Sequence, residues 1–108
     1  MKPRSAKNKG KRLQNLVRDK VLEKFTHLTS RDVRSTVMGE SGSDVKLSEA
    51  AFTVFPYDVE CKANARFAVY KDYEQRGRPD GERLLVIKGD RKEPLVVISL
   101  EHFMEILG

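Results

Sequence analysis

A short stretch in the middle of the sequence places two acidic side chains and one basic side chain on the same side of the backbone. Side chains alternate across a β-strand, so Asp58, Glu60 and Lys62 share one face of the segment 57–62. The other face is apolar and can pack on a core. Many solvated strands have this pattern, so chemistry at this face requires partners from elsewhere in the chain.

Asp44 is the first such partner. It lies sixteen residues before Glu60 and directly after a glycine-containing turn, from which a hairpin can return beside the strand. Two carboxylates and the backbone carbonyl of Cys61 form part of the octahedral oxygen shell that Mg²⁺ prefers, and we expect Mn²⁺ to substitute for it. Lys62, beside a metal-bound water, can orient that water or stabilise charge on a phosphoryl group.

Positive charge is concentrated near the N-terminus. Residues 1–24 carry nine Lys or Arg and two acidic residues, a net charge of +7 in a chain of net charge +5. Such a segment suits a polyanion such as nucleic acid, because phosphate neutralisation releases counterions; a solubilising tail is the alternative. Arg31 and Arg34 can contact phosphates or form a cross-strand ion pair. The DNA-binding candidates are Lys9, Lys11, Arg12, Gln14, Arg31 and Arg34.

The rest of the composition excludes several classes of protein. A single cysteine, Cys61, excludes an internal disulfide and a Cys-rich zinc site. No apolar run approaches the ~20 residues of a membrane span, and residues 1–12 lack the apolar stretch of a secretory signal. We therefore expect an intracellular, cytoplasmic protein without membrane contact. The two histidines, His27 and His102, are expected on helix surfaces.

The length of 108 residues is enough for one compact domain and too short for two. Residues 1–9 lack apolar periodicity and are predicted to form a flexible basic arm, followed by a single domain over residues 10–108. From Gly10 to Leu28, apolar residues recur at spacings of three and four, which predicts a helix. Gln14 falls within the apolar arc of that helix, where its amide needs a partner, either a backbone group or a polar cavity.

Strands and two further helices are predicted to follow. The predicted strands cover residues 29–38, 45–47, 55–62, 84–87 and 95–98, and the helices cover residues 65–77 and 100–107. The segment 48–52 forms either one helical turn or a loop. The last two strands are close enough for an antiparallel pair, and their continuous apolar runs predict burial on both sheet faces. Ser99 is placed to cap the closing helix.

The order of these motifs resembles a known family. Asp44, followed by Glu60-Cys61-Lys62 on a strand that lies between two helices, is similar to the PD-(D/E)XK nuclease superfamily. Within it, the chain resembles archaeal-type Holliday junction resolvases and small phage-encoded nucleases. The resemblance implies an α/β fold with a restriction-endonuclease-like core, in which an αβββαβ order builds a mixed central sheet flanked by helices.

The resemblance also points to three further positions. In that group a Gly-x-x-x-Glu motif near the start of the first helix supplies an acid, and here the matching stretch from Gly10 ends in Gln14. Glu40 can replace the missing acid as a metal ligand, or it is a solvated turn carboxylate. Gln75 lies on the second predicted helix, where such nucleases often carry a polar residue near the site.

The implied function is Mg²⁺-dependent hydrolysis of a phosphodiester in branched DNA, foremost a four-way Holliday junction. Asp44, Glu60, Lys62 and Gln75 are then the expected catalytic residues. A homodimer is expected, because a symmetric pair of sites matches the near two-fold symmetry of a junction. Two alternatives are a nuclease that acts on flaps, nicks or duplex DNA, and a non-catalytic nucleic-acid-binding module on the same fold.

Overall fold

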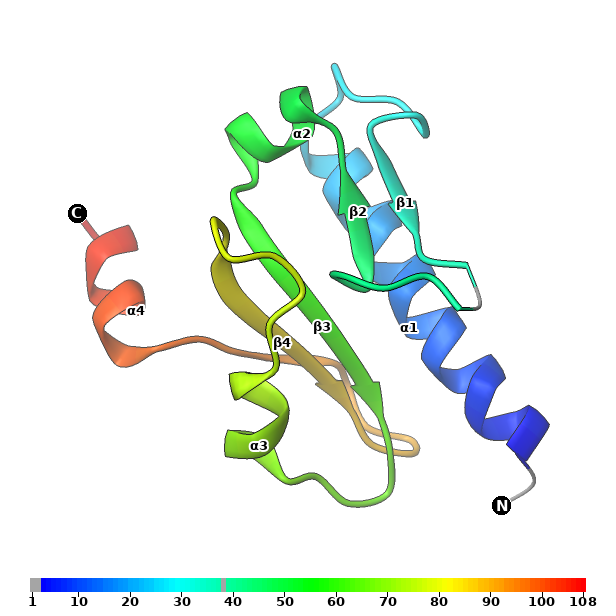
Figure 1. Cartoon of the computed structure of the whole chain (residues 1–108). Helices are drawn as coiled ribbons and strands as arrows, with labels where there is room; N and C mark the ends of the chain where they lie inside the picture. Colours follow the sequence, from blue (N-terminus) through cyan, green and yellow to red (C-terminus); the bar gives the residue numbers. More distant parts are fainter. Residues whose placement is uncertain (1–2, 38) are drawn as a thin grey trace.

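The computed structural model describes residues 3–37 and 39–108, with side chains from residue 8 onward. Four helices alternate with five strands along this part of the chain (Figure 1). They are α1 (Pro3–Lys24), β1 (Val33–Ser35), β2 (Val45–Leu47), α2 (Glu49–Val54), β3 (Tyr57–Ala63), α3 (Val69–Glu74), β4 (Glu82–Lys88), β5 (Leu95–Val97) and α4 (Leu100–Ile106).

The strands form two small sheets. β3 pairs with β4 in parallel and β4 pairs with β5 antiparallel, which makes a mixed three-stranded sheet. The parallel pair requires a crossover connection, and α3 lies within it. β1 and β2 form a separate antiparallel hairpin. This hairpin is joined to the larger sheet where the backbone N–H of Asp44 donates to the carbonyl of Val59, at 2.9 Å.

Helix α1 packs against both sheets and forms the core with them. Its apolar residues recur every three or four positions, so they lie on one face of the helix. Leu13 and Val21 on that face are buried in one cluster with Val33 of β1 and Val59 of β3. Because a cavity here would open between three elements, we expect Leu13→Ala to cost ~2–5 kcal/mol of stability.

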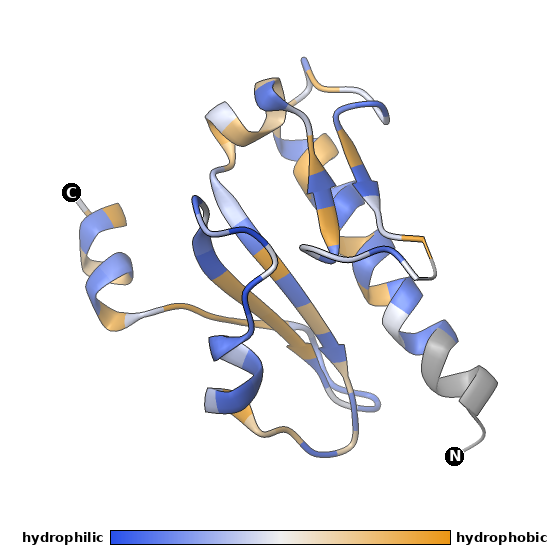
Figure 2. Ribbon diagram, in the orientation of Figure 1, coloured by the Kyte–Doolittle hydropathy of each residue, from blue (hydrophilic) through white to orange (hydrophobic). Residues whose placement is uncertain are grey.

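The opposite face of the mixed sheet carries the polar side chains of β3 beside Leu85 and Ile87 of β4, and it is covered in part by α3. Arg83 of β4 reaches that helix, where its Nε donates to the carbonyl of Tyr73 at 2.9 Å. Figure 2 shows the resulting alternation of hydrophobic and hydrophilic residues along β3. The architecture is therefore an α/β fold in which helices flank a mixed sheet, as the sequence predicts at this level.

Several predicted boundaries differ from the structure. The first helix begins at Pro3, so residues 3–9 are helical, and it ends at Lys24 before the predicted limit of Leu28. The first strand is only Val33–Ser35, because residues 29–32 form a turn in which the Asp32 carboxylate accepts from the N–H of Thr29. Residues 1–2 of the predicted arm and residue 38 of the predicted first strand lie outside the described residues.

Of the later helices, α2 takes the helical option predicted for its segment, and α3 departs from the prediction at its start. The segment after Ser48 is helical, because its hydroxyl accepts from the N–H of Ala51 at 3.1 Å and caps α2. Helix α3 begins only at Val69, four residues later than predicted, and its N-cap residue Ala68 has no side-chain acceptor to stabilise an earlier turn. The Ser99 cap of α4 is confirmed, since its hydroxyl accepts from the N–H of His102.

The C-terminal part of the chain is more exposed than its apolar sequence predicts. β5 pairs antiparallel with β4, as expected, but Leu95 is 53% exposed and Val96 is 60% exposed. The prediction of burial on both faces is therefore wrong for β5, which is a three-residue edge strand. Helix α4 lies at the edge of the fold (Figure 1). No helix among the described residues is long and apolar enough to cross a membrane.

Candidate functional site

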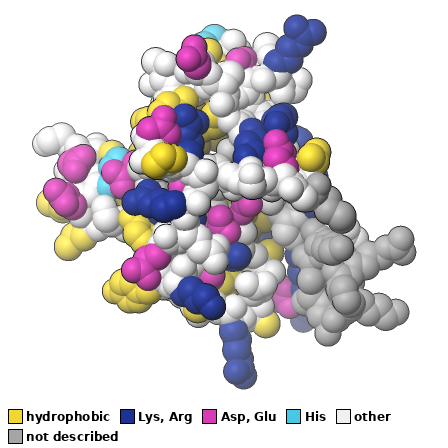
Figure 3. All heavy atoms as spheres, viewed as in Figure 1, with side chains coloured by type: hydrophobic (Ala, Val, Ile, Leu, Met, Phe, Trp, Pro, Cys, Tyr) yellow, Lys and Arg dark blue, Asp and Glu magenta, His cyan; other side chains and the backbone are white. Residues whose placement is uncertain are grey.

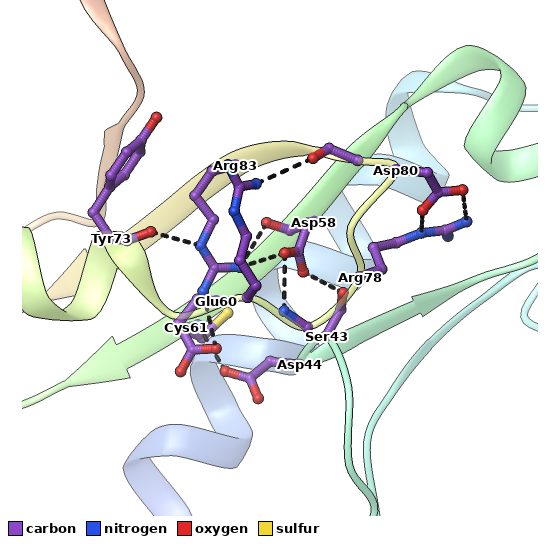
Figure 4. A network of polar contacts seen from close by, with 12 residues as sticks. Ser43, Asp44, Asp58, Glu60, Cys61, Tyr73, Arg78, Asp80 and Arg83 are labelled. Carbon is purple, nitrogen blue, oxygen red and sulfur yellow. Dashed lines mark hydrogen bonds and ion pairs between the residues drawn. The ribbon is translucent and has the colours of Figure 1, made fainter.

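Three of the predicted site residues come together on the polar face of β3. The carboxylate of Asp44, directly before β2, accepts a hydrogen bond from the backbone N–H of Cys61 at 2.8 Å. On the same strand, Lys62 Nζ lies 3.4 Å from Glu60 Oε2. Figure 4 shows the carboxylates of Asp44 and Glu60 side by side. The hairpin and the strand alternation thus build the group that the sequence predicts.

Both carboxylates of this group ionise less readily than free ones. Burial raises the pKa of Asp44, against the lowering effects of the Cys61 N–H and the Lys62 charge. Burial also raises the pKa of Glu60, and the charge of Asp44 raises it further, while Lys62 lowers it. A bound cation would offset the repulsion between these two partly buried carboxylates and favour their ionised forms.

The donor set fits a hard divalent cation. Asp44 and Glu60 offer carboxylate oxygens, which Mg²⁺ prefers, and Mg²⁺ commonly keeps water as its remaining ligands. Across the described residues, no further His, Cys, Asp or Glu joins these two as a third side-chain ligand. Cys61 could contribute only its backbone carbonyl, because its thiol is buried in the core and burial raises the thiol pKa.

Asp58 lies on the same face but has a different role. Its carboxylate is fully buried and accepts from the Ser43 hydroxyl and from the N–H of Gly77, the latter at 2.9 Å. Arg83 Nη1 lies 2.9 Å from its Oδ2 (Figure 4). All these partners come from the protein itself, so Asp58 organises the floor of the site and is not open to a metal.

Gly77 brings the loop before β4 against the turn before Asp44. A Cβ at this position would lie 2.3 Å from the backbone nitrogen of Ser43, so no other residue fits without a shift of the backbone. This close approach places the Gly77 N–H on Asp58. The two loops therefore enclose the buried carboxylate from both sides.

Arg83 is the residue that sequence reasoning missed. It is fully buried, faces Asp58 across the parallel pair, and also lies 3.5 Å from Glu60 Oε1 through Nη2. It therefore links the floor of the site to the candidate metal ligand. The sequence shows a lone arginine at the start of an apolar strand, which could have marked Arg83 as a buried charge. Its partner could not be predicted, because the partner depends on the register between β3 and β4.

Glu40 is committed to another partner. Both of its carboxylate oxygens face the Arg34 guanidinium, at 3.0 and 2.8 Å, and Oε1 also accepts from the N–H of Val37. These contacts lower the pKa of Glu40 from 4.5 to about 2. The structure therefore shows Glu40 in a turn ion pair and not beside Asp44. Arg34 is thus paired with a turn residue and not across the strands, and a phosphate contact of Arg34 stays a prediction.

Gln14 and Gln75 lie outside the carboxylate group. The Gln14 side-chain oxygen accepts a hydrogen bond from the Thr36 hydroxyl at 3.3 Å, so the amide has a polar partner. The Thr36 N–H in turn donates to the Asp44 carbonyl, so Gln14 supports the backbone near the site. Gln75 ends α3 and is exposed. A catalytic role for Gln75 stays a prediction.

Four of the six predicted DNA-binding residues line two clefts, and Lys11 and Gln14 line neither of them. Arg31 and Arg34 line a cleft of about 490 Å³ between the hairpin and the loop after Gly77, and Lys46 and Arg78 join them there. Lys9 and Arg12 line a second cleft at the other end of α1 with Lys88 and Arg91. These four additional basic residues were not predicted from the sequence, because they come from distant elements. Figure 3 shows Lys and Arg side chains interspersed with acids on the viewed face.

Part of this positive charge is already engaged within the chain. Lys9 Nζ lies 2.6 Å from Asp90, and Lys11 Nζ donates to the Thr36 carbonyl at 2.6 Å. Arg78 is paired with Asp80 at 2.7 Å. Both clefts are therefore positive on balance but not uniformly basic.

His102 departs from its predicted surface position. Its Nε2 is hydrogen-bonded to the Tyr57 hydroxyl at 2.7 Å, and its side chain is only 12% exposed. The interpretation of His102 as a helix-surface residue is wrong, because this contact attaches α4 to β3. His27, in the turn after α1, is exposed.

No family model, curated protein or solved structure matches this chain.

Proposed function

We propose that this protein is a magnesium-dependent DNA endonuclease with a restriction-endonuclease-like core of the PD-(D/E)XK type, and that its substrate is branched DNA, foremost a Holliday junction. One observation carries the proposal. The Asp44 carboxylate is held by the Cys61 N–H on the strand that also presents Glu60, with Lys62 Nζ 3.4 Å from Glu60. This is a pair of metal ligands with an adjacent ammonium group.

Each residue has a distinct role in this proposal. Asp44 and Glu60 hold the cation, and the cost of ionising both is the reason that they favour it. When bound, Mg²⁺ supplies the positive charge that acidifies water and stabilises a leaving oxygen. The Lys62 ammonium donates hydrogen bonds to the attacking water or to a phosphate oxygen, and so compensates negative charge there. Arg83 helps to position the Glu60 carboxylate through its charge contact with Oε1.

The two basic clefts supply the means to hold a nucleic acid. Lys and Arg side chains that contact phosphates position a polymer without reading its bases. Binding of this kind is selective for shape and weakens steeply with salt. A symmetric pair of chains would present one site to each of two strands of a four-way junction.

Two other functions remain as candidates. The fold alone does not decide among junctions, flaps, nicks and duplex DNA as substrates. A non-catalytic binding module is favoured by one specific observation: Gln14 stands where the resembled family has an acid, and its amide is bonded to Thr36. The number of carboxylates at the site is then lower than in that family.

Cleavage of defined DNA structures tests these candidates. Labelled four-way junction, flap, nicked and linear duplexes are incubated with the full chain and Mg²⁺, Mn²⁺ or chelator. We expect metal-dependent paired incisions in the junction, lost in Glu60→Gln and in Lys62→Ala while junction binding is kept. The matched controls are Glu49→Gln and Lys92→Ala, which remove the same charges at exposed positions.

The outcomes separate the three functions. Equal cutting of linear duplex contradicts the junction assignment and leaves a general nuclease. Binding of DNA without cutting, with either metal, contradicts the enzyme and supports the binding module. Calorimetric titration with Mn²⁺ gives a readout independent of cleavage, and unchanged affinity in Glu60→Gln contradicts the metal site itself.

A further inference from the structure

Helix α4 carries an apolar stripe that the chain leaves uncovered. Its residues at positions i, i+3, i+4 and i+7 lie on one face of a helix. These residues are Leu100, Phe103, Met104 and Leu107, and they are between 46% and 76% exposed. Single exposed apolar residues are common, but a contiguous stripe of four marks a contact surface.

The attachment of α4 to the rest of the chain turns this stripe outward. His102 holds the helix through the Tyr57 hydroxyl, and its Nδ1 lies 3.6 Å from Glu82. At about 100° per residue, His102 lies on the side of α4 roughly opposite the stripe. The anchored side therefore faces the chain's own sheet, and the stripe faces away from it.

An apolar groove of matching character lies elsewhere on the molecule. It runs between α1 and the strands β4 and β5, has a volume of about 570 Å³, and is lined mainly by aliphatic and aromatic side chains. Leu16, Val17, Phe25 and Leu84 are among its lining residues, with Val96 of the exposed edge strand. In Figure 1, α4 lies on the opposite side of the fold from α1.

The charges beside the stripe and the groove are complementary. Glu101 and Glu105 lie one turn apart between the apolar stripe and the His102 side of α4, where Glu105 Oε2 lies 4.0 Å from His102 Nδ1 and the Glu105 side chain is still exposed. Helix α4 contains no Lys or Arg. Lys20 and Lys24 lie one turn apart on α1 and line the groove. The same spacing on both helices allows each acid to face one base.

We propose that α4 of one chain docks its apolar stripe in the α1–β4–β5 groove of a second copy, with Glu101 and Glu105 facing Lys20 and Lys24. The exchange is reciprocal, as a two-fold dimer requires. This interface does not depend on the nuclease proposal, because it uses none of the candidate site residues.

The first experiment measures association of the full chain by sedimentation velocity over a range of concentrations. We expect a dimer whose dissociation constant rises by about a hundredfold or more in Phe103→Ser/Met104→Ser, because central apolar anchors dominate interface energies. Tyr70→Ser is the matched control, since Tyr70 is 84% exposed on α3 and outside the proposed interface. Circular dichroism verifies that both variants are folded.

A charge exchange identifies the occupant of the groove. Glu101→Lys/Glu105→Lys and Lys20→Glu/Lys24→Glu each place like charges across the interface, and each is expected to weaken self-association about tenfold. In an equimolar mixture both crossed contacts become complementary, so the two variants form a heterodimer with affinity near that of the unmodified chain. Glu74→Lys, exposed on α3, controls for net charge.

Three results overturn the proposal. One is a chain that stays monomeric at all concentrations. Another is a dimer that is insensitive to the changes in both α4 and the groove. The third is a pair of charge variants that weaken association alone and do not combine when mixed, which places α4 against some other surface.

Discussion

The Arg83 guanidinium lies 2.9 Å from the Asp58 carboxylate, and both side chains are fully buried. The two residues face each other across the parallel pair of β3 and β4. Ser43 and Gly77 satisfy the remaining hydrogen-bonding capacity of the carboxylate, and Tyr73 accepts from the guanidinium. This pair ties together the elements that position Asp44 and Glu60.

Removal of one member of the pair should be strongly destabilising. In Arg83→Met the Asp58 charge is left buried without its partner, and breaking a buried ion pair in this way costs about 3–5 kcal/mol. We expect urea denaturation to show a loss of this size, and Asp58→Asn/Arg83→Met to recover part of it. Arg66→Met, at an exposed loop position, controls for loss of an arginine. A loss below ~1 kcal/mol in Arg83→Met would contradict the structural role.

Asp44 should lower the stability of the metal-free protein at neutral pH. Its pKa is raised in the folded state, mainly by burial, so folding is favoured when it is protonated and weakened as pH rises through the folded pKa. Asp44→Asn is therefore expected to melt a few degrees above the unmodified chain at pH 7 without divalent cations.

Two further measurements test this origin of the effect. The difference in melting temperature should shrink as pH is lowered through the carboxylate range, where Asp44 takes up its proton. Mg²⁺ should raise the melting temperature of the unmodified chain and not that of Asp44→Asn. Glu74→Gln, exposed on α3, should behave like the unmodified chain in both respects. A lower melting temperature of Asp44→Asn at pH 7 would contradict the prediction.

Glu40 should contribute to folding and not to metal binding. Its pKa falls from 4.5 to about 2 in the folded state, chiefly through the Arg34 hydrogen bonds. The stabilisation is therefore present above pH 4.5 and lost as pH falls toward 2. We expect Glu40→Gln to be slightly less stable at pH 7, with calorimetric Mn²⁺ affinity unchanged. A tenfold weaker affinity would instead make Glu40 a ligand.

The thiol of Cys61 should be inert in the folded protein. It is 8% exposed within the core cluster, and burial together with the charges of Asp44 and Glu60 raises its pKa. A thiolate is the reactive form. We expect a thiol reagent at pH 8 to modify it only after denaturant is added. Rapid stoichiometric labelling of the native chain would contradict the placement of Cys61 in the core.

Much of the local structure follows from the sequence, because it depends on neighbours along the chain. The alternation of β3 predicts that Glu60 and Lys62 share a face, and Ser99 predicts the cap of α4 through the free N–H groups of a helix start. For these features the relevant interactions span a few residues.

The choice of partners among charged residues was decided only by the tertiary structure. Asp58 and Glu60 are equivalent in the sequence pattern, yet the register of β3 on β4 places Arg83 opposite Asp58 and buries it. Glu40 similarly had two possible roles, and the turn geometry assigned it to Arg34. An ion pair depends on distance and burial, which elements far apart in sequence set jointly.

The sequence by itself therefore determined the strand that presents Glu60 and Lys62 on one face, whereas the position of Asp44 beside that strand depends on contacts between the two sheets. Only the tertiary structure decided that Asp58 belongs to the floor of the site with Arg83, and that the apolar stripe of α4 faces outward. The physical reason is the same in both cases. Periodicity fixes which side chains share a face, whereas packing between distant elements fixes what that face meets.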